Sequence, residues 1–204
     1  MADTQGGVEG GAFVLHLRPA LELDDRQFAA LARQNPELRL ERTAEGDVLV
    51  MAPTGGETGY RNAGITAQLW TWAVRDGTGA AFDSSTGFVL PNGATRSPDA
   101  AWVRGGRLRA LSAEQRERFL PLCPDFVIEL RSPSDSLPAT QAKLDEYLTN
   151  GARLGWLLDV PNRRVFVYRP RTPVMVVDGP ATLSADPELS GFALDLAMVW
   201  EPRF

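Results

Sequence analysis

Runs of apolar residues separated by turn-forming residues predict both strands and helices along this chain. The expected strands span residues 13–18, 38–41, 48–51, 80–82, 87–90, 99–103, 126–131, 154–159, 164–169 and 174–177. Helices are expected over residues 24–34, in a short piece near 112–118, and in two longer segments. This order of elements predicts an α/β or α+β fold with a mixed central sheet flanked by helices.

The two longer helices carry clear start and stop signals. The first begins at residues 54–57, which have the spacing of a capping box, and ends at Asp76-Gly77. The second begins near Pro138 and ends at Asn150-Gly151. Apolar residues recur at helical spacing on the inner face of each helix, and these are Ile65, Leu69, Trp72, Ala73, Leu144 and Leu148.

Length and composition indicate one domain. With 204 residues, of which 44% are hydrophobic, the chain can bury one substantial core, so we expect residues 1–204 to form a single domain with a flexible segment over 1–11. The acidic, glycine-rich start does not resemble a signal peptide, and no apolar run approaches the length of a membrane span. A single cysteine, Cys123, excludes an intramolecular disulfide, and we expect a cytoplasmic protein.

The charge of the chain is unevenly distributed. A net charge of −5 argues at first sight against a nucleic-acid partner. Residues 1–60, however, hold ten acids and five arginines, whereas residues 61–204 hold sixteen acidic and sixteen basic residues. The arginines over residues 96–118 and 163–171 therefore form either local phosphate-binding patches or solvated strand and loop edges.

The strand over residues 126–131 carries two charged side chains on one face. Successive strand residues point to opposite faces, so Glu129 and Arg131 share one face while the apolar residues beside them point into a core. Charged residues rarely occupy strand interiors for packing alone. We therefore expect a functional site at Glu129, with an ion pair that has no chemical role as the alternative.

A second carboxylate, Asp99, follows Ser97-Pro98 at the head of an apolar strand. Carboxylates without nitrogen or sulfur ligands suit a hard cation such as Mg²⁺ or Mn²⁺. His16 is the only histidine and lies in an early strand pattern, so a Ser-His-Asp mechanism and a histidine-based zinc site are unsupported. A divalent cation activates water and offsets the charge on a phosphoryl group, so Asp99 and Glu129 point to phosphodiester hydrolysis.

Lys143 is the only lysine among 21 basic residues. It forms an i, i+4 pair with Tyr147 on the second long helix, and both side chains can lean over the sheet edge that carries Glu129. If a step of the reaction needs a side-chain ammonium group, only Lys143 supplies it. For Tyr147 we expect a half-buried ring with its hydroxyl at the surface.

These residues resemble a known family. The resemblance extends over about residues 20–170 and rests on Ser97-Pro98-Asp99, residues 124–135, Lys143, Tyr147, Asn150-Gly151, residues 155–159 and residues 165–169. They are similar to motifs of the Uma2 family, whose members are described as restriction endonucleases of the PD-(D/E)XK superfamily.

The resemblance implies a nuclease-like core with a restriction-endonuclease-like fold and a divalent-metal site. Asp99 and Glu129 would be the metal ligands, and Glu57 a further acidic contributor to catalysis. The implied enzyme is a hydrolase with DNA as its substrate. Because many nucleases that cut both strands pair two identical subunits, we also expect a homodimer.

The sequence departs from the superfamily pattern at one position. The pattern has lysine two residues after the second acid, where this chain has Arg131. Arginine keeps the charge, but it does not release a proton and its head group is broad and planar. Either Arg131 serves only as an electrostatic clamp, or Lys143 takes the place of the lysine, or the site has lost turnover. In the last case the fold would act as a nucleic-acid-binding or dimerisation module.

Several of these residues also have a purely structural interpretation. Glu57 has a sufficient role as the acid of the capping box, and Asp99 could cap a turn after Pro98. Asp125 follows a proline at a strand start, so we interpret it as a boundary residue. In the C-terminal part, Trp200 and the apolar run over 192–199 predict packing onto the body of the protein.

Overall fold

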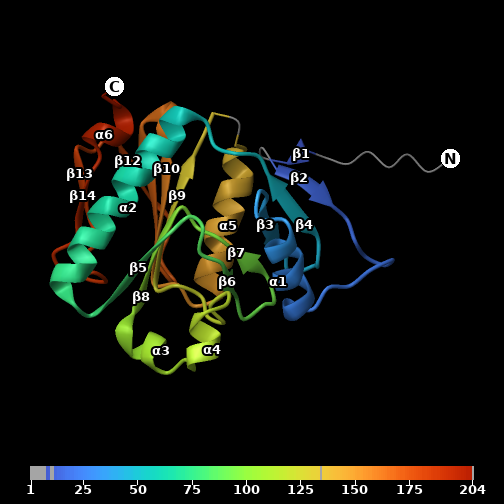
Figure 1. Ribbon diagram of the computed structural model, residues 1–204. Helices are drawn as coiled ribbons and strands as arrows, with labels where there is room; N and C mark the ends of the chain where they lie inside the picture. Colours follow the sequence, from blue (N-terminus) through green and yellow to red (C-terminus); the bar gives the residue numbers. More distant parts are fainter. Residues whose placement is uncertain (1–7, 10–11, 134, 204) are drawn as a thin grey trace.

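The centre of the molecule is a six-stranded mixed sheet (Figure 1). The computed structural model describes residues 8–9, 12–133 and 135–203, so most of the predicted flexible segment 1–11 lies outside the described residues. In spatial order the strands are β12 (Met175–Asp178), β11 (Arg164–Tyr168), β10 (Leu154–Asp159), β9 (Phe126–Arg131), β8 (Ala100–Arg104) and β5 (Gly79–Asp83). The predicted mixed sheet is confirmed.

Strands β9 and β10 run parallel, and helix α5 (Leu137–Thr149) connects them across one face of the sheet. Parallel neighbours need such a crossover because the chain must return to the same end of the sheet. The other neighbouring strands pair antiparallel. Helices cover this sheet on both faces, and β9 and β10 are accordingly buried along almost their whole length.

Helix α2 (Gly56–Asp76) covers the face of the sheet opposite to α5. Ile65 and Leu69 are fully buried, as predicted, and pack with Ile128 of β9. The helix ends at Gly77, whose φ of 69° places it in the left-handed region that favours glycine. The predicted capping box is wrong, because the N-cap is Gly55 and no side chain caps the helix.

A second six-stranded sheet, which the sequence did not reveal as a separate unit, lies on the far side of α5 (Figure 1). Its strands in order are β1 (Val8–Glu9), β2 (Ala12–Leu15), β4 (Val48–Met51), β3 (Arg39–Arg42), β7 (Thr95–Arg96) and β6 (Phe88–Val89). The predicted hairpin of β3 and β4 is confirmed. Strand β2 is shorter than predicted, because its partner β4 begins at Val48, opposite Leu15.

Short helices and the C-terminal strands complete the fold. Helix α1 (Asp25–Gln34) starts with a capping box formed by Asp24 and Gln27 and buries Phe28 against the second sheet. The remaining elements are α3 (Gly105–Arg109), α4 (Ala113–Arg116), the 3-10 turn Val160–Asn162, β13 (Thr182–Ser184), β14 (Ala193–Asp195) and α6 (Ala197–Trp200).

The C-terminal segment packs onto the body, as predicted. Phe192 is 2% exposed, stacks on Trp156 with ring centroids 6.0 Å apart, and meets Phe126 edge-on. Arg61 of α2 donates a hydrogen bond from Nε to the backbone oxygen of Val199 at 2.7 Å. Residues beyond 180 are therefore part of the main core and fix the position of α2.

Replacing Phe192 tests this contribution of the C-terminal segment to the core. We expect Phe192→Ala to lower the free energy of unfolding by about 3–5 kcal/mol, because it removes a buried aromatic ring and leaves a cavity. Urea denaturation followed by tryptophan fluorescence measures the change. The control Val74→Ala, at a side chain 61% exposed, should change it by less than about 0.5 kcal/mol. Equal effects of the two substitutions would contradict this assignment.

Candidate active site

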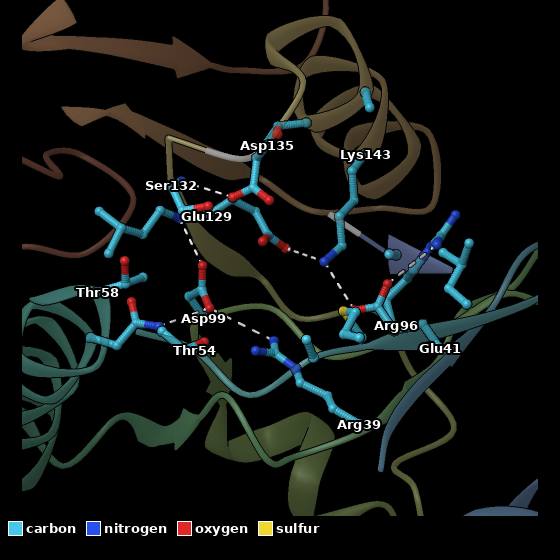
Figure 2. A pocket seen from close by; sticks show the side chains of 18 of the residues that line it. Arg39, Glu41, Thr54, Thr58, Arg96, Asp99, Glu129, Ser132, Asp135 and Lys143 are labelled. Carbon is cyan, nitrogen blue, oxygen red and sulfur yellow. Dashed lines mark hydrogen bonds and ion pairs between the residues drawn. The ribbon is translucent and has the colours of Figure 1, made fainter. Parts of the chain in front are cut away.

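The candidate site lies where the two sheets and α5 meet. Figure 2 shows Lys143 of α5 directed towards Glu129 of the central sheet and Glu41 of the second sheet, with Arg96 on the other side of Glu41 and Asp99 nearby. These side chains line one pocket of about 740 Å³. The structure thus brings Asp99, Glu129 and Lys143, three of the predicted site residues, into a single cavity.

Strand pairing places the two predicted metal ligands side by side. Asp99 immediately precedes β8, whose first residue pairs with Ile128, so the next position along this antiparallel register is Glu129. The backbone amide of Leu130 donates to Oδ2 of Asp99 at 2.8 Å, and Nδ2 of Asn62 donates to Oδ1 at 3.0 Å. Asp99 and Glu129 are 8% and 5% exposed, so both carboxylates lie inside the pocket.

Lys143 contacts two carboxylates at once. Its Nζ lies 2.9 Å from Oε1 of Glu129 and 2.9 Å from Oε1 of Glu41. One turn further along α5, the hydroxyl of Tyr147 donates to the same oxygen of Glu129 at 3.0 Å. The expectation of a surface hydroxyl on Tyr147 is wrong, because α5 lies against the sheet and buries this side chain completely.

Glu41 is a buried carboxylate from the second sheet, with 2% of its surface exposed. Besides Lys143, it accepts hydrogen bonds from the amide of Ser97 at 2.9 Å and from Nη1 of Arg96 at 3.3 Å. Burial alone would raise the pKa of Glu41, but the cationic groups of Lys143 and Arg96 and the Ser97 amide outweigh it and lower this pKa to about 2. Glu41 is therefore ionised.

Glu129 has the opposite electrostatic character. Burial raises its pKa to about 7, and the nearby carboxylates of Asp99 and Glu41 act in the same direction, against the lowering effect of Lys143. Glu129 thus lies near two other carboxylates and beside one ammonium group. A raised pKa of this kind, caused by burial and specific charged neighbours within a pocket, is typical of functional sites.

Two predicted site residues lie outside this pocket. Arg131 donates from Nη1 to Oδ1 of Asp159 at 2.6 Å and from Nε to the backbone oxygen of Asp135 at 3.0 Å. Glu57 has a side chain that is 63% exposed and pairs with Arg61 at 3.0 Å. Both line a neighbouring pocket rather than the one that holds Asp99 and Glu129.

The oxygen donors of the pocket fit a hard divalent cation held in part by water and substrate. Among the described residues, no group of three or more Asp, Glu, His or Cys side chains is arranged to hold a metal ion. Mg²⁺, however, is commonly bound by one or two carboxylates and completes its shell with waters and phosphate oxygens. Asp99 and Glu129 supply such a pair, and a cation between them would offset the excess of carboxylates.

Sequence reasoning missed Glu41 and Arg39, which also line the pocket. Both lie on β3, on either side of the buried Leu40, so alternation places them on one face of that strand. The same signal singled out Glu129, because two charged residues at alternate positions mark a strand face that does not pack apolar side chains. Asp125, in contrast, is a boundary residue as predicted. It immediately precedes β9, and its carboxylate accepts a hydrogen bond from the backbone amide of Arg104.

Comparison with known proteins identifies the family. A family model described as "Uma2: Putative restriction endonuclease" matches residues 25–197. The chain belongs to the Uma2 family. No curated protein matches its sequence.

The fold of this Uma2 protein is similar to that of a solved structure. That structure is described as a putative nuclease belonging to DUF820 from Anabaena variabilis, and the TM-score is 0.67 at 19% sequence identity. The similarity covers 79% of this chain and 89% of the other. The restriction-endonuclease-like fold expected from the sequence is therefore confirmed. Among the described residues, none of the helices has the length and apolar character needed to cross a membrane.

Glu41→Gln tests the electrostatics of the pocket through stability. The pKa of Glu41 lies near 2 in the folded protein, against an ordinary value of 4.5, so its ionised form stabilises the fold above about pH 4.5 and this contribution is lost as the pH falls towards 2. We expect the variant to be about 3 kcal/mol less stable at neutral pH, with the difference shrinking between pH 5 and about pH 3.

Urea denaturation of wild type and variant across this pH range measures the difference. The control Glu201→Gln, at a side chain 75% exposed, should show little effect at any pH. A difference for Glu41→Gln that stays constant down to about pH 3 would show that Glu41 is not the stabilising anion.

Proposed function

We propose that this protein is a divalent-metal-dependent endonuclease that hydrolyses phosphodiester bonds in DNA. The observation that carries this proposal is the meeting of Asp99, Glu129 and Lys143 in one pocket, with Nζ of Lys143 at 2.9 Å from Glu129. Two carboxylates and an ammonium group are the parts that metal-assisted phosphodiester hydrolysis needs. Membership in a family described by its restriction-endonuclease character supports the same reaction.

Each residue has a role in this proposal. Asp99 and Glu129 would hold Mg²⁺ or Mn²⁺, which when bound lowers the pKa of water and offsets charge on the phosphoryl group. Asn62 and the Leu130 amide fix the orientation of Asp99, while Tyr147 fixes that of Glu129. Lys143 places a positive charge beside the reacting groups, where it would orient the water and stabilise the developing negative charge.

The contacts favour Lys143 over Arg131 for the role of the superfamily lysine. Arg131 is engaged by Asp159 and by the backbone of Asp135, and it lies outside the pocket. Lys143 comes from the crossover helix but brings its ammonium group to the second acid of the motif. The lysine of the pattern would thus have moved from the strand to the helix without leaving the site.

The charge of the pocket gives the metal a second role, in substrate binding. Five acidic and three basic side chains line the pocket, which leaves an excess of negative charge that repels a phosphodiester. A divalent cation would remove this repulsion. In this proposal DNA binds only together with the metal, and a homodimer would present one such pocket to each strand.

Metal binding is the first requirement of the proposal. We expect calorimetric titration of Mn²⁺ to show binding to wild type, and Asp99→Asn or Glu129→Gln to weaken it at least about tenfold, because each removes one of two carboxylate ligands. Asp178→Asn is a matched control at an exposed residue of β12, and its affinity should equal that of wild type. If wild type does not bind Mn²⁺, the nuclease proposal fails and the inert binding or dimerisation module is favoured.

The identity of the catalytic lysine is tested by cleavage. With Mn²⁺ binding intact, Lys143→Ala should slow the cleavage of single- or double-stranded DNA by about 100- to 1000-fold, since it removes the charge beside the reacting groups. Arg131→Gln should keep most of the activity, because Arg131 points to Asp159. The reverse ranking of the two variants would return the role to Arg131. Loss of activity in Glu129→Gln guards against cleavage by a contaminant.

A further inference from the structure

Arg39 is a basic residue of the pocket with an unused hydrogen-bond donor. It lies on β3, and its Nη2 donates to the backbone oxygen of Ser97 at 2.7 Å. Its Nε is buried, and among the described residues it has no hydrogen-bond partner. Buried donors without an acceptor are rare in folded proteins, and such a donor commonly has a ligand, an ion or a water as its partner.

The other two basic side chains of the pocket are occupied by carboxylates. Lys143 lies between Glu41 and Glu129, and Arg96 contacts both Glu41 and Glu146. Arg39 is different, because its nearest carboxylate oxygen in an ion pair is Oδ1 of Asp99 at 3.7 Å, beyond hydrogen-bond length. Of the three, Arg39 has the most capacity left for an incoming anion.

The anchor on Ser97 keeps the guanidinium group of Arg39 in place beside Asp99. A guanidinium group is planar and presents adjacent N–H donors at a spacing that matches two oxygens of a phosphate. A phosphate that reaches a cation held by Asp99 and Glu129 therefore arrives next to Arg39. The guanidinium group of Arg39 would then lie beside the reacting group.

A second buried polar atom near Asp99 is also without a partner. Asn62 donates from Nδ2 to Oδ1 of Asp99, which fixes its amide, and its Oδ1 has no hydrogen-bond partner among the described residues. This oxygen is an acceptor, whereas Nε of Arg39 is a donor. A phosphodiester supplies an anionic oxygen that could accept from Nε of Arg39, and the attacking water supplies a hydrogen that Oδ1 of Asn62 could accept. The donor and the acceptor thus match the two reactants of hydrolysis.

We propose that Arg39 binds a non-bridging oxygen of the scissile phosphate through its Nε–H and positions it for attack. This inference rests on the proposed function, since it assumes that a phosphodiester enters the pocket. Binding breaks no bond and transfers no proton. A cation held by Asp99 would compete with Arg39 for this carboxylate, and the charge of Arg39 would then be available to the substrate.

Binding without cleavage provides the test. Fluorescence anisotropy with short fluorescein-labelled oligodeoxynucleotides, single- and double-stranded, in Ca²⁺ measures affinity under conditions chosen to suppress turnover. We expect Arg39→Gln to weaken binding by about 10- to 100-fold, because a charge-assisted hydrogen bond is lost. Arg39→Lys, which keeps the charge but not the Nε–H donor, should recover only part of the affinity.

The control is Arg164→Gln, which removes the same charge at an exposed residue of β11 that pairs with Asp178. Its affinity should stay within about twofold of wild type, because one distant surface charge adds little. Circular dichroism and thermal unfolding show whether the Arg39 variants keep the fold. Arg39→Lys keeps the test valid if Arg39→Gln does not fold.

Titration of Ca²⁺ alone separates a phosphate-binding role from a structural one. If Arg39 only held Asp99 in place, its loss would weaken Ca²⁺ binding together with oligonucleotide binding. We expect Ca²⁺ affinity to be equal or higher in Arg39→Gln, since a cation beside Asp99 has been removed. Weakened Ca²⁺ binding overturns the inference in favour of a residue that positions Asp99.

The outcomes also distinguish this inference from the proposed function. If wild type binds the oligonucleotides and Arg39→Gln binds them equally well, Arg39 does not contact the phosphate, while the nuclease proposal stands. If wild type binds neither oligonucleotide in the presence of metal, the DNA substrate and the phosphate contact both fail. Selective loss of oligonucleotide affinity with Ca²⁺ affinity retained supports both.

Discussion

The ion pairs of Lys143 join the parts of the molecule that form the site. A single ammonium group lies 2.9 Å from one carboxylate of the central sheet and 2.9 Å from one of the second sheet. Buried charges are tolerated only when they are paired and hydrogen-bonded, so Lys143 stabilises Glu41 and Glu129 in their buried positions. The second sheet is therefore docked on the crossover helix by charge as well as by apolar packing.

Local signals in the sequence were enough for the elements with strong apolar periodicity. Helix α2, helix α5 and the hairpin of β10 and β11 were predicted close to their observed bounds, because their inner faces repeat at helical or strand spacing. The division into two sheets could not be predicted in this way. Strand β3 pairs with β7 through Arg42 and Thr95, and such non-local pairing leaves no trace in local spacing.

The residues of the candidate site could likewise be predicted only where a local sequence pattern marks them. Asp99, Glu129 and Lys143 stand out by their sequence context, but Glu41 meets Lys143 across 102 positions of the chain, and only the fold brings them together. The contacts of Arg131 could not be predicted from the motif. Its position on β9 is correct for the motif, yet Asp159 occupies the matching position on the neighbouring strand and binds its guanidinium group.

The C-terminal segment has a consequence for how the protein can be handled. Val199 accepts the Nε–H of Arg61, and the side chain of Gln68 exchanges two hydrogen bonds with the backbone of Asp195. The residue after Arg61 is Asn62, which contacts Asp99. A truncation that removes residues 192–203 would thus take away contacts that hold the helix that orients the first acid of the site, although none of these residues lines the pocket.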